Sequence, residues 1–131
     1  IYGNDFPTPD GTCIRDYIHM IDICSAIEKS TKYLLSNKRS MIFNIGSHKG
    51  LSNNEIVKYI KKTITNKINL SYVNRRKGDV SRLICNSNKI YKTLNWRAKS
   101  SNLKKIITNE ILWIKKFRKK GLNRSFKNYL K

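Results

Sequence analysis

The apolar residues of this chain change their spacing several times, and this alternation limits the folds that the chain can adopt. Short runs rich in β-branched and aromatic residues predict four strands, at 14–20, 41–46, 68–73 and 83–85. Apolar residues that recur every three or four positions predict helices, at about 22–35, 53–64, 87–96 and 102–119. A chain of 131 residues with this alternation is expected to form one α/β unit with short strands and three to four helices.

Several side chains mark where these helices should begin and end. Asp22 is a plausible N-cap of the first helix, and Ser87 of the third. Ser52 and Glu55 form the Ser-x-x-Glu capping box that opens the second helix. Gly121 is a typical stop for the last helix. Each boundary can be predicted from residues within one helical turn of it.

The charge of the chain is strongly positive, with 28 Lys and Arg against 8 Asp and Glu. A basic surface with Trp96, Trp113 and a basic tail would suit a nucleic-acid-binding protein. A second explanation is compositional, because Lys, Asn and Ile have A/T-rich codons and together make up 53 of the 131 residues. The lysines are also spread along the whole chain. We favour the compositional explanation and keep nucleic-acid binding as a rival hypothesis.

The sequence does not fit a membrane-spanning, secreted, disulfide-rich or metal-binding protein. No apolar run approaches the roughly 18–20 residues of a membrane span, and no leader peptide is recognisable. Cys13, Cys24 and Cys85 have no Cys-x-x-Cys spacing, so we expect reduced thiols and a cytoplasmic protein. His19 and His48 have no partner at ligand spacing, and we expect no metal site. The chain starts at isoleucine, within an apparent strand end, which suggests a piece of a longer protein.

Arginine beside turn residues is the main chemical signal. Arg15 lies in a short apolar segment, and a second group of basic residues, RRKGD, spans 75–79. Two guanidinium groups from different loops would suit a diphosphate, because each can bind two phosphate oxygens. Tyr2 and Phe6 offer flat faces for a base. The chemistry alone permits this site and favours simpler alternatives: a local ion pair between Arg15 and Asp16, and a solvated turn at 75–79.

Four stretches resemble, in order and spacing, the C-terminal part of the UDP-glucose 4-epimerase family: IYGNDFPTPDGTCIRDYIHMID, IFNIGSHKGLS, NRRKGD and LNW. That family belongs to the extended short-chain dehydrogenase/reductase superfamily. The resemblance covers residues 1 to about 121. It implies that 1–121 form the UDP-sugar-binding C-terminal domain, with the NAD-binding Rossmann domain missing and with 122–131 as an appended basic tail.

The resemblance also assigns roles to individual residues. It implies that Arg15 and Arg76 hold the UDP phosphates, that Asp79 contacts the ribose and that Tyr2 lies by the uracil. It implies further that Leu83 borders the C2 substituent of the sugar. Two supporting residues of Arg15 are expected from the same motif, Asp16 and Tyr17. The chain departs from the family at Val80, where the family usually has proline after the aspartate.

The implied parent reaction is the NAD-dependent interconversion of UDP-glucose and UDP-galactose in galactose metabolism, by a cytoplasmic homodimer. The glycine-rich NAD loop and the Tyr-x-x-x-Lys catalytic pair are both absent from this sequence. We therefore predict no catalytic residue in the chain, a substrate-binding role and no activity of the chain alone. The alternatives are another NAD-dependent sugar-nucleotide epimerase or dehydratase, and the basic nucleic-acid-binding protein.

Overall fold

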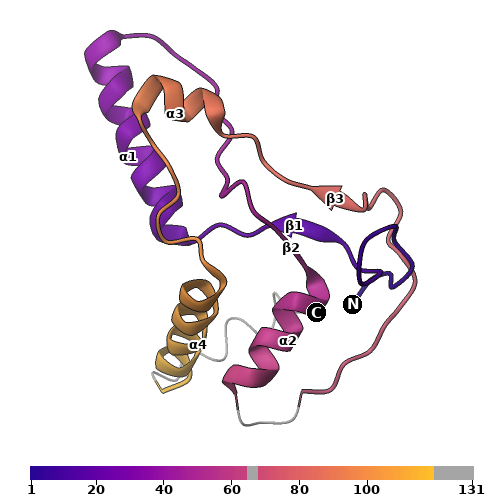
Figure 1. Cartoon of the computed structure of the whole chain (residues 1–131). Coiled ribbons are helices and arrows are strands. Elements are labelled where there is room, and N and C mark those ends of the chain that lie inside the picture. Colours follow the sequence, from indigo (N-terminus) through magenta and orange to yellow (C-terminus); the bar gives the residue numbers. More distant parts are fainter. Residues whose placement is uncertain (65–67, 120–131) are drawn as a thin grey trace.

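The computed structural model describes residues 1–64 and 68–119 (Figure 1). Its strands are short: β1 (Ile14–Asp16), β2 (Gly50–Ser52) and β3 (Arg82–Leu83). Its helices are α1 (Met20–Asn37), α2 (Asn53–Thr63), α3 (Asn88–Leu94) and α4 (Leu103–Lys119). Helices α1 and α3 pack together at one end of the molecule and α2 and α4 at the other, with the small sheet between them. The predicted α/β class is confirmed within these residues.

The sheet has the order β2-β1-β3, so β1 is its central strand. Strand β1 runs antiparallel to β2 and parallel to β3, with Arg15 opposite Leu51 on one side and Leu83 on the other. Successive side chains of a strand point to opposite faces. Arg15 and Asp16 are therefore directed away from each other, which decides what each can contact.

Helix α1 begins earlier than predicted, and its cap is a different residue. His19 is the N-cap, and its Nδ1 accepts a hydrogen bond from the backbone N–H of Ile21 at 3.0 Å. Asp22, the predicted cap, lies buried in the first turn instead. Its carboxylate accepts hydrogen bonds from the backbone N–H of Ser100 and from the hydroxyl of Ser101. The prediction was wrong because this distant loop offers Asp22 more donors than its own helix end.

The predicted capping box is confirmed at the start of α2. The hydroxyl of Ser52 accepts from the backbone N–H of Glu55, and the Glu55 carboxylate accepts from the backbone N–H of Ser52. The start of α3 differs. Ser87 occupies its N-cap position, but its hydroxyl donates to the carbonyl of Gly46 and makes no capping bond.

The hydrophobic core lies where α1 and α3 meet. Ala26, Ile90 and Trp96 are buried at its centre, and five half-buried residues pack around them: Ile18, Phe43, Ile45, Leu94 and Ala98. The Trp96 indole N–H donates to the hydroxyl of Ser25 at 2.8 Å. Trp96 is only 2% exposed, so it cannot serve as a stacking platform for a base. The expectation that it forms part of a nucleic-acid surface was wrong.

Two predicted strands are not present as ladders. Residues 41–45 alternate between half-buried and exposed positions, with Ile42 84% exposed, and Gly46 is buried, yet 41–46 pair with no strand among the described residues. Residues 68–73 contribute one bridge, between Val73 and Tyr2. A strand needs a hydrogen-bonding neighbour, which its own sequence does not supply. Residues 41–46 have no such neighbour among the described residues, and 68–73 bridge to the N-terminal segment only at Val73. The predicted stop at Gly121 and the basic tail, 122–131, lie outside the described residues.

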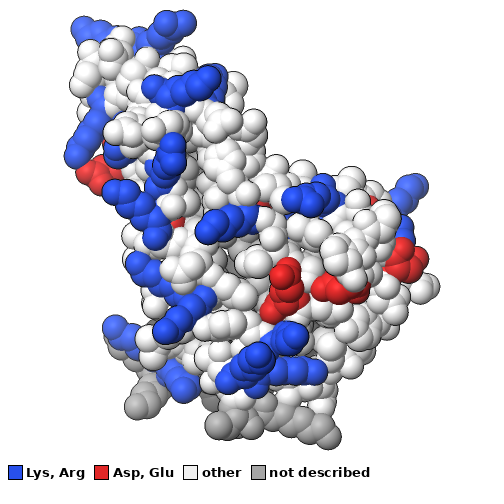
Figure 2. All heavy atoms as spheres, viewed as in Figure 1, with Lys and Arg blue, Asp and Glu red and all other residues white. Residues whose placement is uncertain are grey.

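The charged side chains are dispersed, as the compositional explanation predicts. Figure 2 shows Lys and Arg side chains scattered over the whole visible face, with no single basic stripe. Within the described residues, no helix combines the length and the apolar character that crossing a membrane requires. The three cysteines are free thiols.

Candidate functional site

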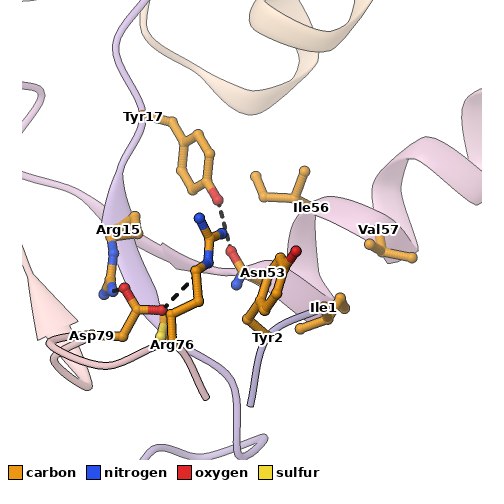
Figure 3. A pocket seen from close by; sticks show the side chains of 10 residues that line it. Ile1, Tyr2, Arg15, Tyr17, Asn53, Ile56, Val57, Arg76 and Asp79 are labelled. Atoms are coloured by element: carbon orange, nitrogen blue, oxygen red, sulfur yellow. Dashed lines mark hydrogen bonds and ion pairs between the residues drawn. The ribbon is translucent and has the colours of Figure 1, made fainter. Parts of the chain in front are cut away.

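A pocket of about 460 Å³ opens between the N-terminal segment, β1, the first turns of α2 and the 75–79 loop (Figure 3). Its volume lies within the range of roughly 300–1,000 Å³ that is typical of small-molecule sites. Ten residues line it: Ile1, Tyr2, Cys13, Arg15, Tyr17, Asn53, Ile56, Val57, Arg76 and Asp79. Five of the six substrate-binding residues implied by the resemblance are therefore brought together in one pocket.

Arg15 reaches the pocket from the central strand. Its Nη1 donates to the carbonyls of Val80 at 2.8 Å and Ile14 at 3.0 Å, which fixes the guanidinium group. Its Nη2 lies 3.6 Å from a carboxylate oxygen of Asp79. Two backbone bonds and one loose ion pair leave Arg15 with donors to offer a ligand, since a guanidinium group carries five.

Asp16 faces the other way and supports a different loop. Its carboxylate accepts from the backbone N–H groups of Ser47 at 2.9 Å and His48 at 3.2 Å, and from that of Cys85 at 3.2 Å. The alternative of a local Arg15–Asp16 ion pair is therefore wrong. Asp16 is also no direct support for Arg15, because alternation along β1 places the two side chains on opposite faces.

Arg76 enters the pocket from a tight turn. Gly78 has a φ of +89°, a conformation that glycine adopts without steric cost, and the Asp79 N–H closes the turn on the carbonyl of Arg76. The Arg76 guanidinium lies 3.9 Å above the centre of the Tyr2 ring, and its Nε lies 3.9 Å from Asp79. The predicted charged turn is confirmed, and it directs one arginine inward.

Arg75, the neighbouring arginine, has a structural role. Its guanidinium lies 4.1 Å above the centre of the Phe6 ring, and its Nε pairs with the carboxylate of Asp5 at 2.7 Å. Phe6 is only 5% exposed beneath it. Phe6 was expected to offer an open face for a base, and that expectation was wrong because Arg75 covers the ring. Arg76 also lies over one face of the Tyr2 ring, but Tyr2 is still 46% exposed, so the rest of its ring retains this possibility.

Tyr17 forms the inner wall of the pocket. Its phenol donates to Oδ1 of Asn53 at 2.9 Å. Burial raises the pKa of the Tyr17 phenol, and the opposing effect of the Arg15 charge is smaller. The phenol therefore stays protonated at neutral pH and remains a hydrogen-bond donor.

Five pocket residues, Ile1 among them, were not predicted from the sequence, and one predicted residue lies elsewhere. Cys13, Asn53, Ile56 and Val57 line the pocket, and the capping box could have pointed to the last three because it places the first turns of α2 directly after β2. Leu83 lies on β3, is 62% exposed and is not among the lining residues. Its predicted contact with the sugar stays a prediction.

The pocket carries two guanidinium groups and one carboxylate, and so has a net positive charge. Grouped His, Cys, Asp or Glu side chains that could hold a metal ion are not found within the described ranges. Arginine forks suit phosphate geometry, and an adjacent aromatic face suits a base. Chemically, the arrangement fits a nucleoside diphosphate.

The known relatives agree with this chemistry. The profile of a family described as GDP-mannose 4,6 dehydratase matches residues 1–109. The chain belongs to this family. Within the family, it is 41% identical over 113 residues to the UDP-glucose 4-epimerase of Lacticaseibacillus casei, which covers 86% of the chain and 34% of that relative. It is 39% identical to UDP-arabinose 4-epimerase 1 of Arabidopsis thaliana, over 88% of the chain and 27% of that relative.

Solved structures of similar proteins lead to the same family fold. The UDP-glucose 4-epimerase of Stenotrophomonas maltophila, solved with NAD and formylated UDP-arabinopyranose, superposes with a TM-score of 0.84 at 28% identity, over 91% of the chain and 35% of that protein. The dTDP-glucose 4,6-dehydratase of Bacillus anthracis gives 0.56 at 28% identity, over 76% and 31%. The chain thus has the fold of part of an extended short-chain dehydrogenase/reductase and spans about a third of its relatives' length.

Proposed function

We propose that the chain supplies the UDP-sugar site of a UDP-glucose 4-epimerase. The observation that carries the proposal is the convergence of Arg15 and Arg76, from distant segments, on one pocket beside the exposed Tyr2 ring. The similarity to UDP-glucose 4-epimerases supports this choice of ligand. The runner-up is a related sugar-nucleotide epimerase or dehydratase, favoured by the match to the dehydratase family.

The proposed roles follow from the contacts of each residue. Arg15 and Arg76 bind the two phosphates, and the base lies against Tyr2. Asp79 accepts hydrogen bonds from the ribose hydroxyls. Its ion pairs with the two arginines are long, at 3.6 and 3.9 Å. The Arg76 guanidinium can therefore turn toward a ligand at little cost, whereas Arg15, which its backbone bonds hold in place, offers its remaining donors. Leu83 borders the sugar.

NAD would be held outside these residues. The chain has no glycine-rich strand–turn–helix loop and no Tyr-x-x-x-Lys pair, so its residues do not fit that cofactor and no hydride step is assigned to them. The parent enzyme is proposed to be a cytoplasmic homodimer of galactose metabolism that interconverts UDP-glucose and UDP-galactose. The chain alone binds substrate and does not turn it over.

Titration of UDP into the 131-residue chain, followed by NMR, tests the proposal. Arg76→Ala and Arg15→Ala should each weaken UDP binding by about 10- to 150-fold, because each removes charge-assisted hydrogen bonds. Arg15→Lys should restore part of the loss, since an ammonium group cannot bind two oxygens in parallel. Lys77→Ala is the matched control, because it removes one positive charge from the same turn outside the pocket. Equal affinities of Arg76→Ala and the wild type would refute the proposal.

The rival nucleic-acid hypothesis predicts a different result. Binding to a phosphate backbone weakens steeply as salt rises from low to moderate concentration, whereas binding at a UDP site changes far less. Tight binding of single-stranded oligonucleotides that collapses with salt, combined with no UDP binding, would favour the rival.

A further inference from the structure

Asn53 occupies the pocket without a role in the proposal above. It is the first residue of α2, is half-buried and follows directly on the capping serine. Figure 3 shows its side chain directed toward Tyr17, whose hydroxyl donates to Oδ1 at 2.9 Å. The Asn53 amide is therefore held in the same pocket as the two arginines.

The bond to Tyr17 fixes which end of the amide faces the ligand. Because burial raises the pKa of the Tyr17 phenol, the hydroxyl keeps its proton and donates to the amide oxygen. The Nδ2 group of Asn53 is then turned away from Tyr17. Within the part of the chain that the structure describes, this Nδ2 group has no hydrogen-bond partner. Two N–H donors are thus left for a molecule in the pocket.

The backbone of α2 cannot provide these donors instead. The N–H of Asn53 donates to the carbonyl of Cys13, and that of Asn54 to the hydroxyl of Thr12. The N–H of Glu55 donates to Ser52 within the capping box. In the first turn of α2, the donor that remains available to a ligand in the pocket is therefore the side-chain amide of Asn53.

We propose that Nδ2 of Asn53 donates to a phosphate oxygen of the bound diphosphate, as a third donor group beside Arg15 and Arg76, and that Tyr17 positions it. This inference rests on the proposed function, because it concerns the same ligand. The phosphate is the favoured acceptor because its oxygens are anionic and the two arginines draw them into the pocket that Asn53 also lines. Tyr17 is a positioning residue, since its hydroxyl is occupied by the amide oxygen.

Asn53→Asp is the informative variant. A carboxylate keeps an acceptor for the Tyr17 hydroxyl but has no donor, and it repels phosphate. We expect UDP binding, measured by NMR titration of the whole chain, to weaken at least tenfold. Binding of uridine, which lacks phosphates, should stay unchanged. Asn53→Ala, which adds no charge, should weaken UDP binding several-fold and again spare uridine. If Asn53→Asp does not fold, Asn53→Ala alone decides.

Asn54→Asp is the matched control. It makes the same charge change one residue further along α2, and its Oδ1 also accepts from a tyrosine, Tyr72, at 2.9 Å, but Asn54 does not line the pocket. It should bind UDP nearly as the wild type does. Tyr17→Phe should weaken UDP binding by less than Asn53→Ala and leave uridine unaffected, because the amide stays in the pocket but loses its fixed orientation.

Three outcomes would overturn the inference. If Asn53→Asp and Asn53→Ala bind UDP as Asn54→Asp does, while Arg76→Ala still binds UDP more weakly, Asn53 has no such role and the proposed function stands. If both variants lose uridine and UDP equally, the amide contacts the nucleoside and not the phosphate. If the wild-type chain binds no UDP, the proposed function fails and the inference fails with it.

Discussion

At the scale of the residue, Asp79 combines two roles that oppose each other. It lies near both pocket arginines, so it offsets part of the positive charge that attracts phosphate. It is also the proposed ribose acceptor. The first role weakens the binding of any phosphate, whereas the second strengthens only the binding of a nucleotide. A ligand without ribose therefore separates them.

Asp79→Asn should affect the binding of pyrophosphate and UDP to different extents. Pyrophosphate should bind roughly 2- to 5-fold more tightly, because a partly exposed ion pair no longer competes for the guanidinium groups. UDP should gain less or lose affinity, since an amide is a poorer acceptor for two hydroxyls. Calorimetric titration of both ligands into the variant and the wild type measures the change in affinity for each ligand. An equal gain for both would show that Asp79 does not contact the ribose.

Leu83 is the other residue whose role can be isolated. We expect it to restrict the entry of N-acetylated sugars by steric overlap, at a cost of typically about 1–3 kcal/mol. In a hybrid that joins this chain to a complete N-terminal domain, Leu83→Ser should raise kcat/KM for UDP-N-acetylglucosamine selectively. If the ratio of kcat/KM for the acetylated and plain substrates is unchanged, Leu83 does not face the sugar. Its 62% exposure and its position outside the pocket lining would account for that result.

At the scale of the element, Asp22 ties α1 to the segment that precedes α4. Its buried carboxylate accepts hydrogen bonds from the backbone N–H groups of Lys99 and Ser100 and from the Ser101 hydroxyl. Burial alone would raise the pKa of Asp22, but these hydrogen bonds outweigh it and the net pKa is lowered. A carboxyl group whose pKa is lower in the folded chain stabilises the fold above its unfolded pKa, and that stability is lost as the pH falls through the folded value.

Asp22→Asn should therefore destabilise the chain at neutral pH by about 1–3 kcal/mol, because an amide NH₂ group would face backbone donors. The stability of the wild type should fall as the pH drops below about 4, and that of the variant should fall less. Urea unfolding between pH 3 and 7 measures both effects. Glu28→Gln is the control, since its bond to Lys32 is exposed and screened by solvent. Parallel pH profiles of Asp22→Asn and the wild type would contradict this role.

At the scale of the whole molecule, the chain exposes apolar residues along one helix and the segment after it. They belong to α1 and to 41–46: Met20, Ile21, Ile27, Leu34, Leu35 and Ile42. Large apolar patches are rare on isolated soluble domains. The chain also spans about a third of its relatives' length. We therefore predict that the chain needs further protein for stability and for turnover.

We expect the purified 131-residue chain to show marginal stability, no epimerase activity and no tight NAD binding. A coupled assay for the interconversion of UDP-glucose and UDP-galactose, together with NAD fluorescence titration, measures the last two properties. The hybrid with a complete N-terminal domain is the positive control and should be active. Turnover by the chain alone above the buffer background would contradict the assignment of the chemistry to other residues.

Part of this picture was predictable from the sequence because its signals are local. The capping box of Ser52 and Glu55, the Gly78 turn and the apolar stripe of α4 each involve residues within a turn or two of one another. The long stretch around Arg15 identified the family, and through it half of the residues that line the pocket. Such features need no knowledge of distant neighbours.

Only the tertiary structure decided which side chains act together. In the structure Arg15 bonds to the carbonyl of Val80, and Asp16 points to the opposite face. Arg76 lines the pocket, whereas its neighbour Arg75 covers the ring of Phe6. Asp22 does not cap its helix and instead accepts a hydrogen bond from the distant Ser100. Residues 41–46 have no strand partner in the described ranges. In each case the partner lies far away in sequence. The free energy of these contacts depends on which segments the fold brings together, and no local pattern encodes that.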